Sequence, residues 1–149
     1  MWFKKKTEFI SPITGTLLPL SQVNDPTFAE GMMGPGFAII PKESELYAPC
    51  NGIIKMIFPT KHAIGIQCAD GKELLLHIGI DTVALNGEGF TVHVAQGDRI
   101  KAGDKLMTID LPFIKEKGYD SVIICALPNE SDFTISNLPK EIHKGEPIK

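Results

Sequence analysis

Glycine and proline interrupt this chain so often that the apolar segments between them stay short. The sequence holds 14 glycines and 11 prolines among its 149 residues, and both residue types favour turns over regular structure. The segments between them are rich in Ile, Val, Leu, Phe and Thr, which favour extended backbone. Examples are residues 37–40, 52–58, 90–94, 105–109 and 122–126. Many short strands separated by turns predict an all-β fold, a compact antiparallel β-sandwich or barrel.

Helix is expected only in a few short pieces. Asp25 followed by Pro26 is typical of a helix N-cap with proline at the first helical position. Asp110 begins a second such segment, which has basic residues in its last turn and Gly118 at its end. Both helices are expected to be short additions to a β-rich domain.

Length and composition indicate a single globular domain. A chain of 149 residues with 43% hydrophobic and 22% charged residues is long enough to bury a core. We expect a short N-terminal tail over residues 1–9 and one domain over residues 10–149. The net charge of −3 gives no indication of a nucleic-acid partner.

The cysteines and the hydropathy pattern bear on location. The three cysteines, Cys50, Cys68 and Cys125, are odd in number and well separated, and they form no CxxC motif. They therefore predict a reducing, cytoplasmic location rather than a disulfide framework. No stretch is long and apolar enough to span a membrane, and the N-terminus lacks the apolar core of a signal peptide.

The clearest local signal is a β-hairpin around Asp70 and Gly71. Apolar residues flank this pair on both sides, in 63–66 and 74–78. Asp-Gly between two such runs is typical of a two-residue type I′ turn, which needs positive φ at both central residues. This pairing defines the register of the two strands, and a histidine lies near the outer end of each.

In that register His62 lies opposite Gly79 and diagonally across from His77. Because side chains alternate between faces, both imidazoles are expected on one face, with backbones about 7–8 Å apart. Thr60 would share this face, and Ile64 would rim a shallow apolar depression suited to protein docking. A three-residue loop would instead put the histidines on opposite faces.

Two neighbouring imidazoles are compatible with several chemistries. They could hold a metal ion, act as base and nucleophile, or carry a group covalently. Each could also be an ordinary half-buried histidine, and Thr60 could be present only as a good strand former. The hairpin alone leaves these alternatives open.

The segments around the histidines resemble a known family. The chain is similar to the glucose-family enzyme IIA domains of the bacterial phosphotransferase system, and the likeness extends from Ile10 to Ile148. The strongest matches to the active-site signature are residues 58–63, 77–83 and 85–90. Further matches are residues 28–30, 34–39, 48–49, 97–98, 102–104 and 110–112.

The resemblance implies a role for each histidine. His77 corresponds to the histidine that accepts a phosphoryl group from HPr and passes it to a cysteine of a sugar-specific IIB domain. His62 corresponds to the neighbouring histidine, which hydrogen-bonds the phosphoryl group, and Thr60 to the threonine that orients the pair. The implied fold is an antiparallel β-sandwich, in agreement with the expected strands.

The resemblance also implies a docking surface and a set of partners. Acidic rim residues would meet basic residues of HPr, and apolar residues would form a collar that both partners use. By resemblance the rim residues are Asp25 and Asp81, and the collar residues are Phe28, Phe58 and Val83. We expect a free-standing monomer that needs no cofactor and no metal of its own and meets the membrane only through the permease.

Two other functions compete with this interpretation. A zinc-binding β-rich hydrolase could use His62 and His77, but it needs a third protein ligand and the sequence has no His-x-His motif. A biotinyl or lipoyl carrier module could use Lys55, but that lysine would have to lie at a hairpin tip rather than mid-strand. An inert scaffold is the third possibility.

Overall fold

The computed structural model describes residues 7–149, which form two antiparallel sheets and four short helical segments. The strands are β1 (Gly15–Pro19), β2 (Gly36–Pro41), β3 (Glu45–Tyr47), β4 (Gly52–Ile57), β5 (Ala63–Cys68), β6 (Glu73–Ile78), β7 (Phe90–Val92), β8 (Arg99–Ile100), β9 (Lys105–Ile109), β10 (Ile123–Ala126) and β11 (Lys140–Ile142). The helices are α1 (Pro26–Ala29) and α2 (Leu111–Glu116), with 3-10 turns η1 (Leu20–Gln22) and η2 (Thr82–Leu85).

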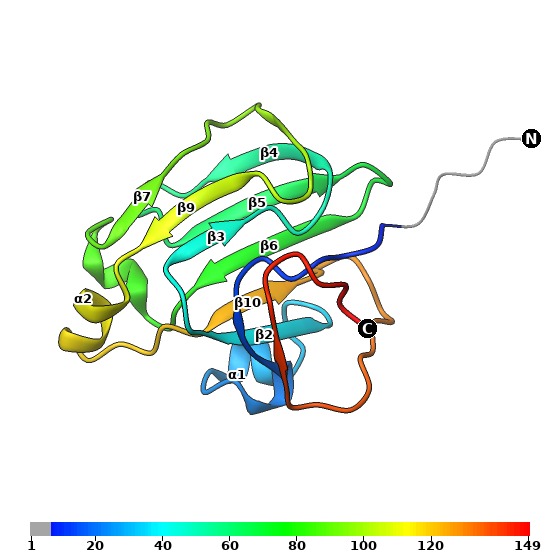
Figure 1. Ribbon diagram of the computed structural model, residues 1–149, viewed down its shortest axis with the longest axis horizontal. Helices are drawn as coiled ribbons and strands as arrows, with labels where there is room; N and C mark the ends of the chain where they lie inside the picture. The colour runs from blue at the N-terminus through cyan, green and yellow to red at the C-terminus, as the bar shows by residue number, and fades with distance from the viewer. Residues whose placement is uncertain (1–6) are drawn as a thin grey trace, which may run out of the picture.

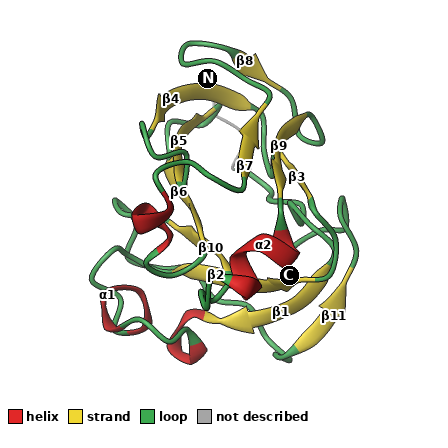
Figure 2. Ribbon diagram, turned by 90° about the vertical axis from the view of Figure 1, so that its left-hand side faces the viewer, coloured by secondary structure: helices red, strands yellow, loops and turns green. Residues whose placement is uncertain are grey.

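The larger sheet has eight strands in the order β11-β1-β2-β10-β6-β5-β4-β8, and the smaller has the order β3-β9-β7. Figure 1 shows the small sheet lying across β4 and β5, with α1 near β2. Figure 2 shows the larger sheet curling from β4 at the top to β1 and β11 at the bottom, with the smaller sheet facing it. The predicted all-β fold with few short helices is confirmed.

The main core fills the space between the two sheets, and its side chains come from alternate positions of the strands. Ile64 on β5, Leu76 on β6 and Met107 on β9 are all fully buried there. A second, smaller apolar cluster includes Leu18 and Phe28 and lies with η1 and α1. Both faces of the central strands are therefore covered, which explains their nearly continuous apolar sequences.

One row of side chains leads across the large sheet to His77. Leu18 pairs with Ala38, Ala38 with Ile124, Ile124 with His77, and His77 with Ala63. Three of these residues, Leu18, Ala38 and Ile124, belong to the second apolar cluster. His77 therefore lies at the end of a packed row on the face of the sheet away from the main core.

The predicted hairpin register is wrong by one residue. Ala63 pairs with His77, and Cys68 and Lys72 close a three-residue loop through the Cys68 N–H to the Lys72 carbonyl at 2.7 Å. Only Gly71 of the loop has a positive φ, so the turn is not type I′. Asp70 instead accepts hydrogen bonds with its carboxylate, and a two-residue loop is not formed.

The two predicted helices are present with the expected caps. The Asp25 carboxylate accepts a hydrogen bond from the Thr27 N–H at 3.0 Å at the start of α1. The Asp110 carboxylate accepts one from the Phe113 N–H at 3.1 Å at the start of α2. Gly118, with φ of 85°, follows the second helix.

The packed chain begins before the predicted boundary at residue 10. Phe9 is 4% exposed and belongs to the main core, and its carbonyl accepts a hydrogen bond from the Ile148 N–H at 2.9 Å. The Thr7 N–H donates to the Asp70 carboxylate at 2.8 Å. The rest of the predicted tail, residues 1–6, lies outside the described residues. Across residues 7–149, no helix is long and apolar enough to cross a membrane.

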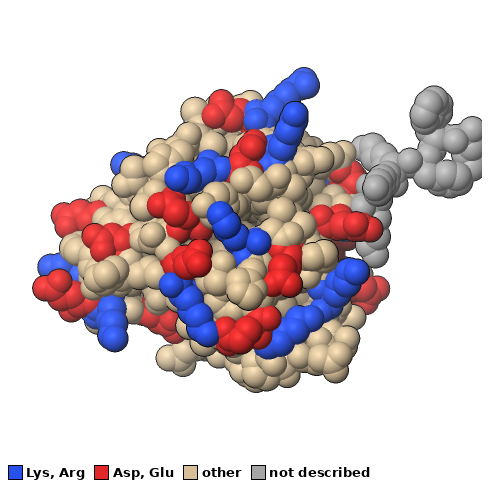
Figure 3. Space-filling model, viewed as in Figure 1, with Lys and Arg blue, Asp and Glu red and all other residues tan. Residues whose placement is uncertain are grey.

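Charges of both signs are mixed on one face of the molecule. On the face shown in Figure 3, lysine and arginine side chains alternate with aspartate and glutamate. A field of one sign, which a nucleic-acid backbone would require, is absent from this face.

Candidate phosphoryl-transfer site

The two histidines meet although the register differs from the prediction. Their ring centroids are 5.1 Å apart and the rings are nearly perpendicular, at 85°. His62 lies in the turn before β5, where strand alternation does not apply, and the preceding Lys61 has φ of 59°. The turn, rather than the ladder, therefore brings the His62 side chain to the face of the sheet that holds His77.

The orientation of His77 is determined by a backbone carbonyl. Its Nδ1 lies 2.8 Å from the Gly79 carbonyl oxygen, which can only accept, so Nδ1 carries the proton. The neutral ring then has its lone pair on Nε2, and Nε2 is the nucleophilic atom. His77 is half-buried, so this atom has limited contact with water.

The Gly79 carbonyl is held by a tight turn after β6. Gly79 has φ of 79°, and its N–H donates to the Val122 carbonyl at 2.7 Å. A Cβ on residue 79 would lie 2.5 Å from Thr82 Cγ2 and 2.7 Å from the Asp120 carbonyl oxygen. Only glycine fits here, because both the dihedral angle and the space exclude a side chain.

His62 is oriented by Thr60. The Thr60 hydroxyl lies 2.6 Å from His62 Nδ1, and the Phe58 ring packs edge-on against the imidazole with centroids 5.4 Å apart. With the hydroxyl donating to Nδ1, the neutral ring carries its proton on Nε2, a donor available to a phosphoryl oxygen. His62 itself is 8% exposed.

Burial disfavours the charged form of both imidazoles. It lowers the pKa of His62 and of His77 below the usual 6.5, and the neighbouring His77 charge further lowers the pKa of His62. The Gly79 carbonyl and the carboxylates of Asp25 and Asp81 act in the opposite direction on the pKa of His77. A neutral His77 is a nucleophile near pH 7 without a prior deprotonation.

The expected apolar collar is formed only in part. Phe28 is 5% exposed and packs on the His77 ring with centroids 4.9 Å apart, so it is a wall of the site. Phe58 is half-buried, and Val83 on η2 is 50% exposed. The prediction that Ile64 rims the depression is wrong. Its side chain belongs to the main core and is fully buried.

The two acidic residues expected at the rim lie close enough to act on His77 electrostatically. Asp81 is exposed and has a left-handed backbone with φ of 60° at the start of η2. Asp25 is half-buried and caps α1. Each is therefore held by a local backbone structure beside the histidine pair.

The alternative functions find no support in these residues. In the described chain, residues 7–149, no group of three or more His, Cys, Asp or Glu side chains is placed to hold a metal ion. Lys55 is exposed in the middle of β4, between the strand ends at Gly52 and Ile57, and not at a hairpin tip. A zinc hydrolase and a biotinyl or lipoyl carrier both lack their central feature here.

Comparison with known proteins identifies the family. The family model described as phosphoenolpyruvate-dependent sugar phosphotransferase system, EIIA 1, matches residues 7–133. The chain belongs to this EIIA family. It is a phosphotransferase-system protein, a phosphocarrier component of sugar uptake.

Close relatives and a solved structure agree with this assignment. The chain is 46% identical over 125 residues to the PTS system glucose-specific EIIA component of Oceanobacillus iheyensis, covering 84% of this chain and 76% of the relative. It is 49% identical over 119 residues to the component of that name from Halalkalibacterium halodurans, covering 80% and 69%. The glucose permease IIA from Mycoplasma capricolum matches with a TM-score of 0.86 at 41% identity, over 99% of this chain and 97% of that chain.

Two parts of this EIIA site were missed in the sequence. The Gly79 carbonyl and the fully buried Thr82, whose hydroxyl donates to the Ile78 carbonyl, together hold the turn that orients His77. A glycine directly after a strand is a signal for such a turn. The sequence gives no sign that its carbonyl turns back to the imidazole two residues earlier.

Proposed function

We propose that His77 Nε2 accepts a phosphoryl group from phospho-HPr and passes it to a cysteine of a IIB domain. The observation that carries the proposal is the Nδ1 contact to the Gly79 carbonyl, at 2.8 Å, which leaves the Nε2 lone pair free. The lone pair attacks phosphorus as the bond from phosphorus to the HPr histidine breaks, in line. The proton on Nδ1 stays in place throughout.

Nearby groups stabilise the positive charge that develops on His77 as it is phosphorylated. The Gly79 carbonyl and the carboxylates of Asp25 and Asp81 favour the charged ring. In the second step a thiolate of the IIB cysteine attacks the phosphorus, and the bond to Nε2 breaks. The neutral imidazole is then restored with its lone pair again on Nε2.

His62 is proposed to stabilise the transferring group without becoming phosphorylated. Its ring centre lies 5.1 Å from that of His77, and Thr60 occupies its Nδ1. Nε2–H of His62 can then donate to a phosphoryl oxygen, where negative charge is spread in the transition state. Phe28 and Phe58 limit the access of water to the phosphohistidine.

The proposed docking surface surrounds this pair. Val83 supplies exposed apolar surface, and Asp25 and Asp81 supply negative charge for basic residues of HPr. An apolar cavity of about 240 Å³ adjoins the site through Phe58 and includes Met33. A small apolar collar of this kind suits transient docking of partners such as HPr and IIB.

The remaining proposals concern where the protein works. We propose a cytoplasmic protein that contacts the membrane only through the permease, because HPr and the IIB domain act on that side. The three free cysteines agree with a reducing compartment. We propose a monomer, to be checked by sedimentation.

Incubation with phosphoenolpyruvate, enzyme I and HPr tests the assignment of His77. Intact mass should show the gain of one phosphoryl group that mild acid removes, and peptide mapping should place it on His77. His77→Gln should show no gain. A His77→Gln protein that still becomes phosphorylated would overturn the proposal, as would wild type that stays unmodified beside active HPr.

A further inference from the structure

Two cysteines that are well separated in sequence are in contact at the end of the hairpin away from the histidines. Cys50 Sγ and Cys68 Sγ are 3.4 Å apart. Cys68 is the last residue of β5, and Cys50 comes two residues before β4. A disulfide requires the sulfurs to approach to about 2.0 Å, which is a small movement of the two side chains.

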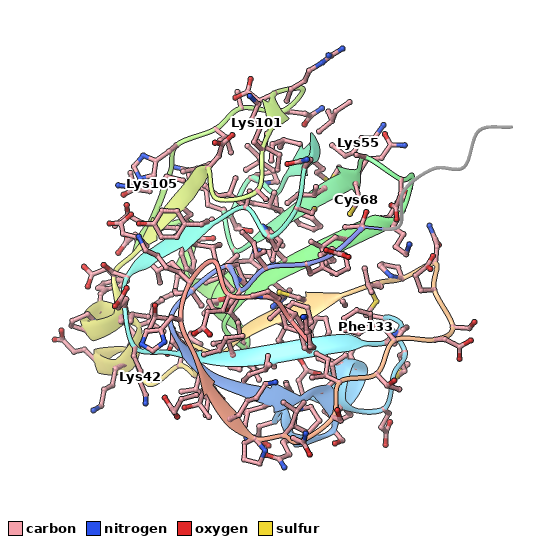
Figure 4. All side chains as sticks on the ribbon, turned by 45° about the vertical axis from the view of Figure 1, so that its right-hand side comes forward. Lys42, Lys55, Cys68, Lys101, Lys105 and Phe133 are labelled. Carbon is pink, nitrogen blue, oxygen red and sulfur yellow. The ribbon has the colours of Figure 1, made fainter. Side chains whose placement is uncertain are left out.

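An open cavity of about 590 Å³ adjoins this pair at Cys68. Cys68 forms part of its wall, and Arg99 and Lys101 also line it. Figure 4 labels Cys68 and Lys101, which come from different segments of the chain. Both residues are nearly buried, with Cys50 at 1% and Cys68 at 3% exposure. Of the two, Cys68 lines the cavity, so a small molecule in the cavity meets Cys68 first.

The two thiols are not equivalent. The contact between the two sulfurs lowers the pKa of Cys68 and raises the pKa of Cys50. Lys72 also lowers the pKa of Cys68, whereas burial and Asp70 raise it. Cys68 therefore holds the negative charge of the pair when one proton is lost, and Cys50 keeps its proton.

From this contact and its access route we infer that Cys50 and Cys68 form a redox-sensitive dithiol that hydrogen peroxide converts to a disulfide. The Cys68 thiolate attacks the terminal oxygen of the peroxide, the O–O bond breaks, and hydroxide leaves and takes up a proton. Cys68 is then a sulfenic acid. Cys50 attacks this sulfur, its proton goes to the departing hydroxyl group, and water leaves. In total, two thiols and one peroxide give one disulfide and two waters.

The position of the disulfide predicts what it changes. Cys50 and Cys68 are 18 residues apart and enclose β4, β5 and the turn that bears Thr60 and His62. The link would close this hairpin at its base and constrain the unfolded chain, so oxidation should raise Tm. His62 precedes β5 and His77 pairs with Ala63 at the start of β5, whereas Cys68 is at its end. Phosphorylation should therefore continue in the oxidised form.

The third cysteine is a control within the same molecule. Cys125 is fully buried on β10, and burial raises the pKa of its thiol. The sulfur–sulfur contact at 3.4 Å joins Cys50 and Cys68 and does not include Cys125. We therefore expect Cys125 to stay a thiol under conditions that oxidise the pair.

Mild hydrogen peroxide on the wild-type chain tests the inference. Unreacted thiols are then alkylated in denaturant, and the products are analysed by intact mass and by non-reducing peptide mapping. We expect the loss of two hydrogen atoms, one linked peptide pair containing Cys50 and Cys68, alkylation of Cys125 alone, and reversal by a dithiol reductant. An alkylated Cys50 and Cys68 after peroxide, or a linkage through Cys125 or between two chains, would overturn it.

Two variants test the order of events. Cys50→Ser should accumulate a sulfenic acid on Cys68 that a dimedone probe captures, because the resolving thiol is missing. Cys68→Ser should leave Cys50 reduced, and Cys125→Ser should oxidise as the wild type does. Circular dichroism checks that each variant is folded. Dimedone labelling of Cys50 in the Cys68→Ser variant would contradict the assignment of Cys68 as the attacking thiol.

Discussion

At the residue scale the chemistry depends on how each imidazole uses its Nδ1. His77 donates a hydrogen bond from Nδ1–H to a backbone carbonyl, whereas Nδ1 of His62 lies against a threonine hydroxyl. The two rings can therefore present different groups, a lone pair and a donor, to one phosphoryl group. The local partners of the two rings, rather than their residue type, separate their proposed roles.

Replacement of His62 should separate phosphoryl acceptance from transfer. His62→Ala should still become phosphorylated on His77, because the nucleophile is intact. Transfer to a IIB domain should slow by about 10²-fold, since one donor to the transferring group is lost. Rapid-quench measurement of phosphoryl loss from His77 checks this prediction. His62→Gln keeps an N–H donor and should recover part of the rate, and an unchanged rate in His62→Ala would rule out the role.

The lowered histidine pKa values predict a pH dependence of folding. The unfolded chain takes up protons near pH 6.5, whereas folded His62 and His77 take them up only at lower pH. The contribution of the two neutral histidines to the free energy of unfolding is therefore complete above the pKa of the unfolded chain. It is lost as the pH falls through the lower pKa values of the folded chain. Urea unfolding at about pH 7.5 and about pH 5.5 should show lower stability at the acid value. The double variant His62→Gln/His77→Gln should lose less stability over this interval, and an equal loss would contradict the argument.

At the element scale the site depends on two turns, one before β5 and one after β6. The Asp70-Gly71 signal correctly predicted the hairpin between these strands, but not its register. Asp70 also binds the Thr7 N–H, a contact between residues 63 positions apart that no local pattern contains. The contact between Cys50 and Cys68 is hidden in the sequence for the same reason. Strand content, helix caps and the histidine pair come from local patterns and from the family resemblance, and these could be predicted.

The turn after β6 should tolerate no side chain at Gly79. Gly79→Ala meets both an unfavourable φ and the Asp120 carbonyl, so the loss in the free energy of unfolding should be about 2 kcal/mol or more. Gly97→Ala is the matched control, because its φ of 93° is similar and nothing lies within 4 Å of the added Cβ. Urea unfolding of both variants measures the difference. Equal destabilisation would show that the close contacts around Gly79 have no cost.

At the scale of the whole molecule, the fold places the proposed transfer site away from both the main core and the cysteine pair. The row of pairs from Leu18 to Ala63 ends beside His77 on one face of the large sheet, and the main core lies on the other face. The redox-sensitive pair lies at the opposite end of the hairpin that carries His62. Partner docking and cysteine oxidation are therefore expected to be independent of each other.

Exposed apolar surface at Val83 should matter for docking and not for folding. Val83→Lys removes apolar contact and adds a charge that repels a basic partner, so KM for phospho-HPr should rise by about tenfold. Ile53→Lys is the control, because Ile53 is 37% exposed on β4, toward the cysteine end of the hairpin. Steady-state phosphorylation against HPr concentration separates KM from kcat. A rise in KM of equal size in both variants would contradict the placement of the docking surface.

The proposed chemistry depends on which nitrogen of His77 carries the phosphoryl group. NMR of ¹⁵N-histidine-labelled protein, phosphorylated through HPr, distinguishes the two by the coupling of phosphorus to one ring nitrogen. We expect coupling to His77 Nε2, with Nδ1 still protonated against the Gly79 carbonyl. Coupling to His77 Nδ1, or to either nitrogen of His62, would contradict it.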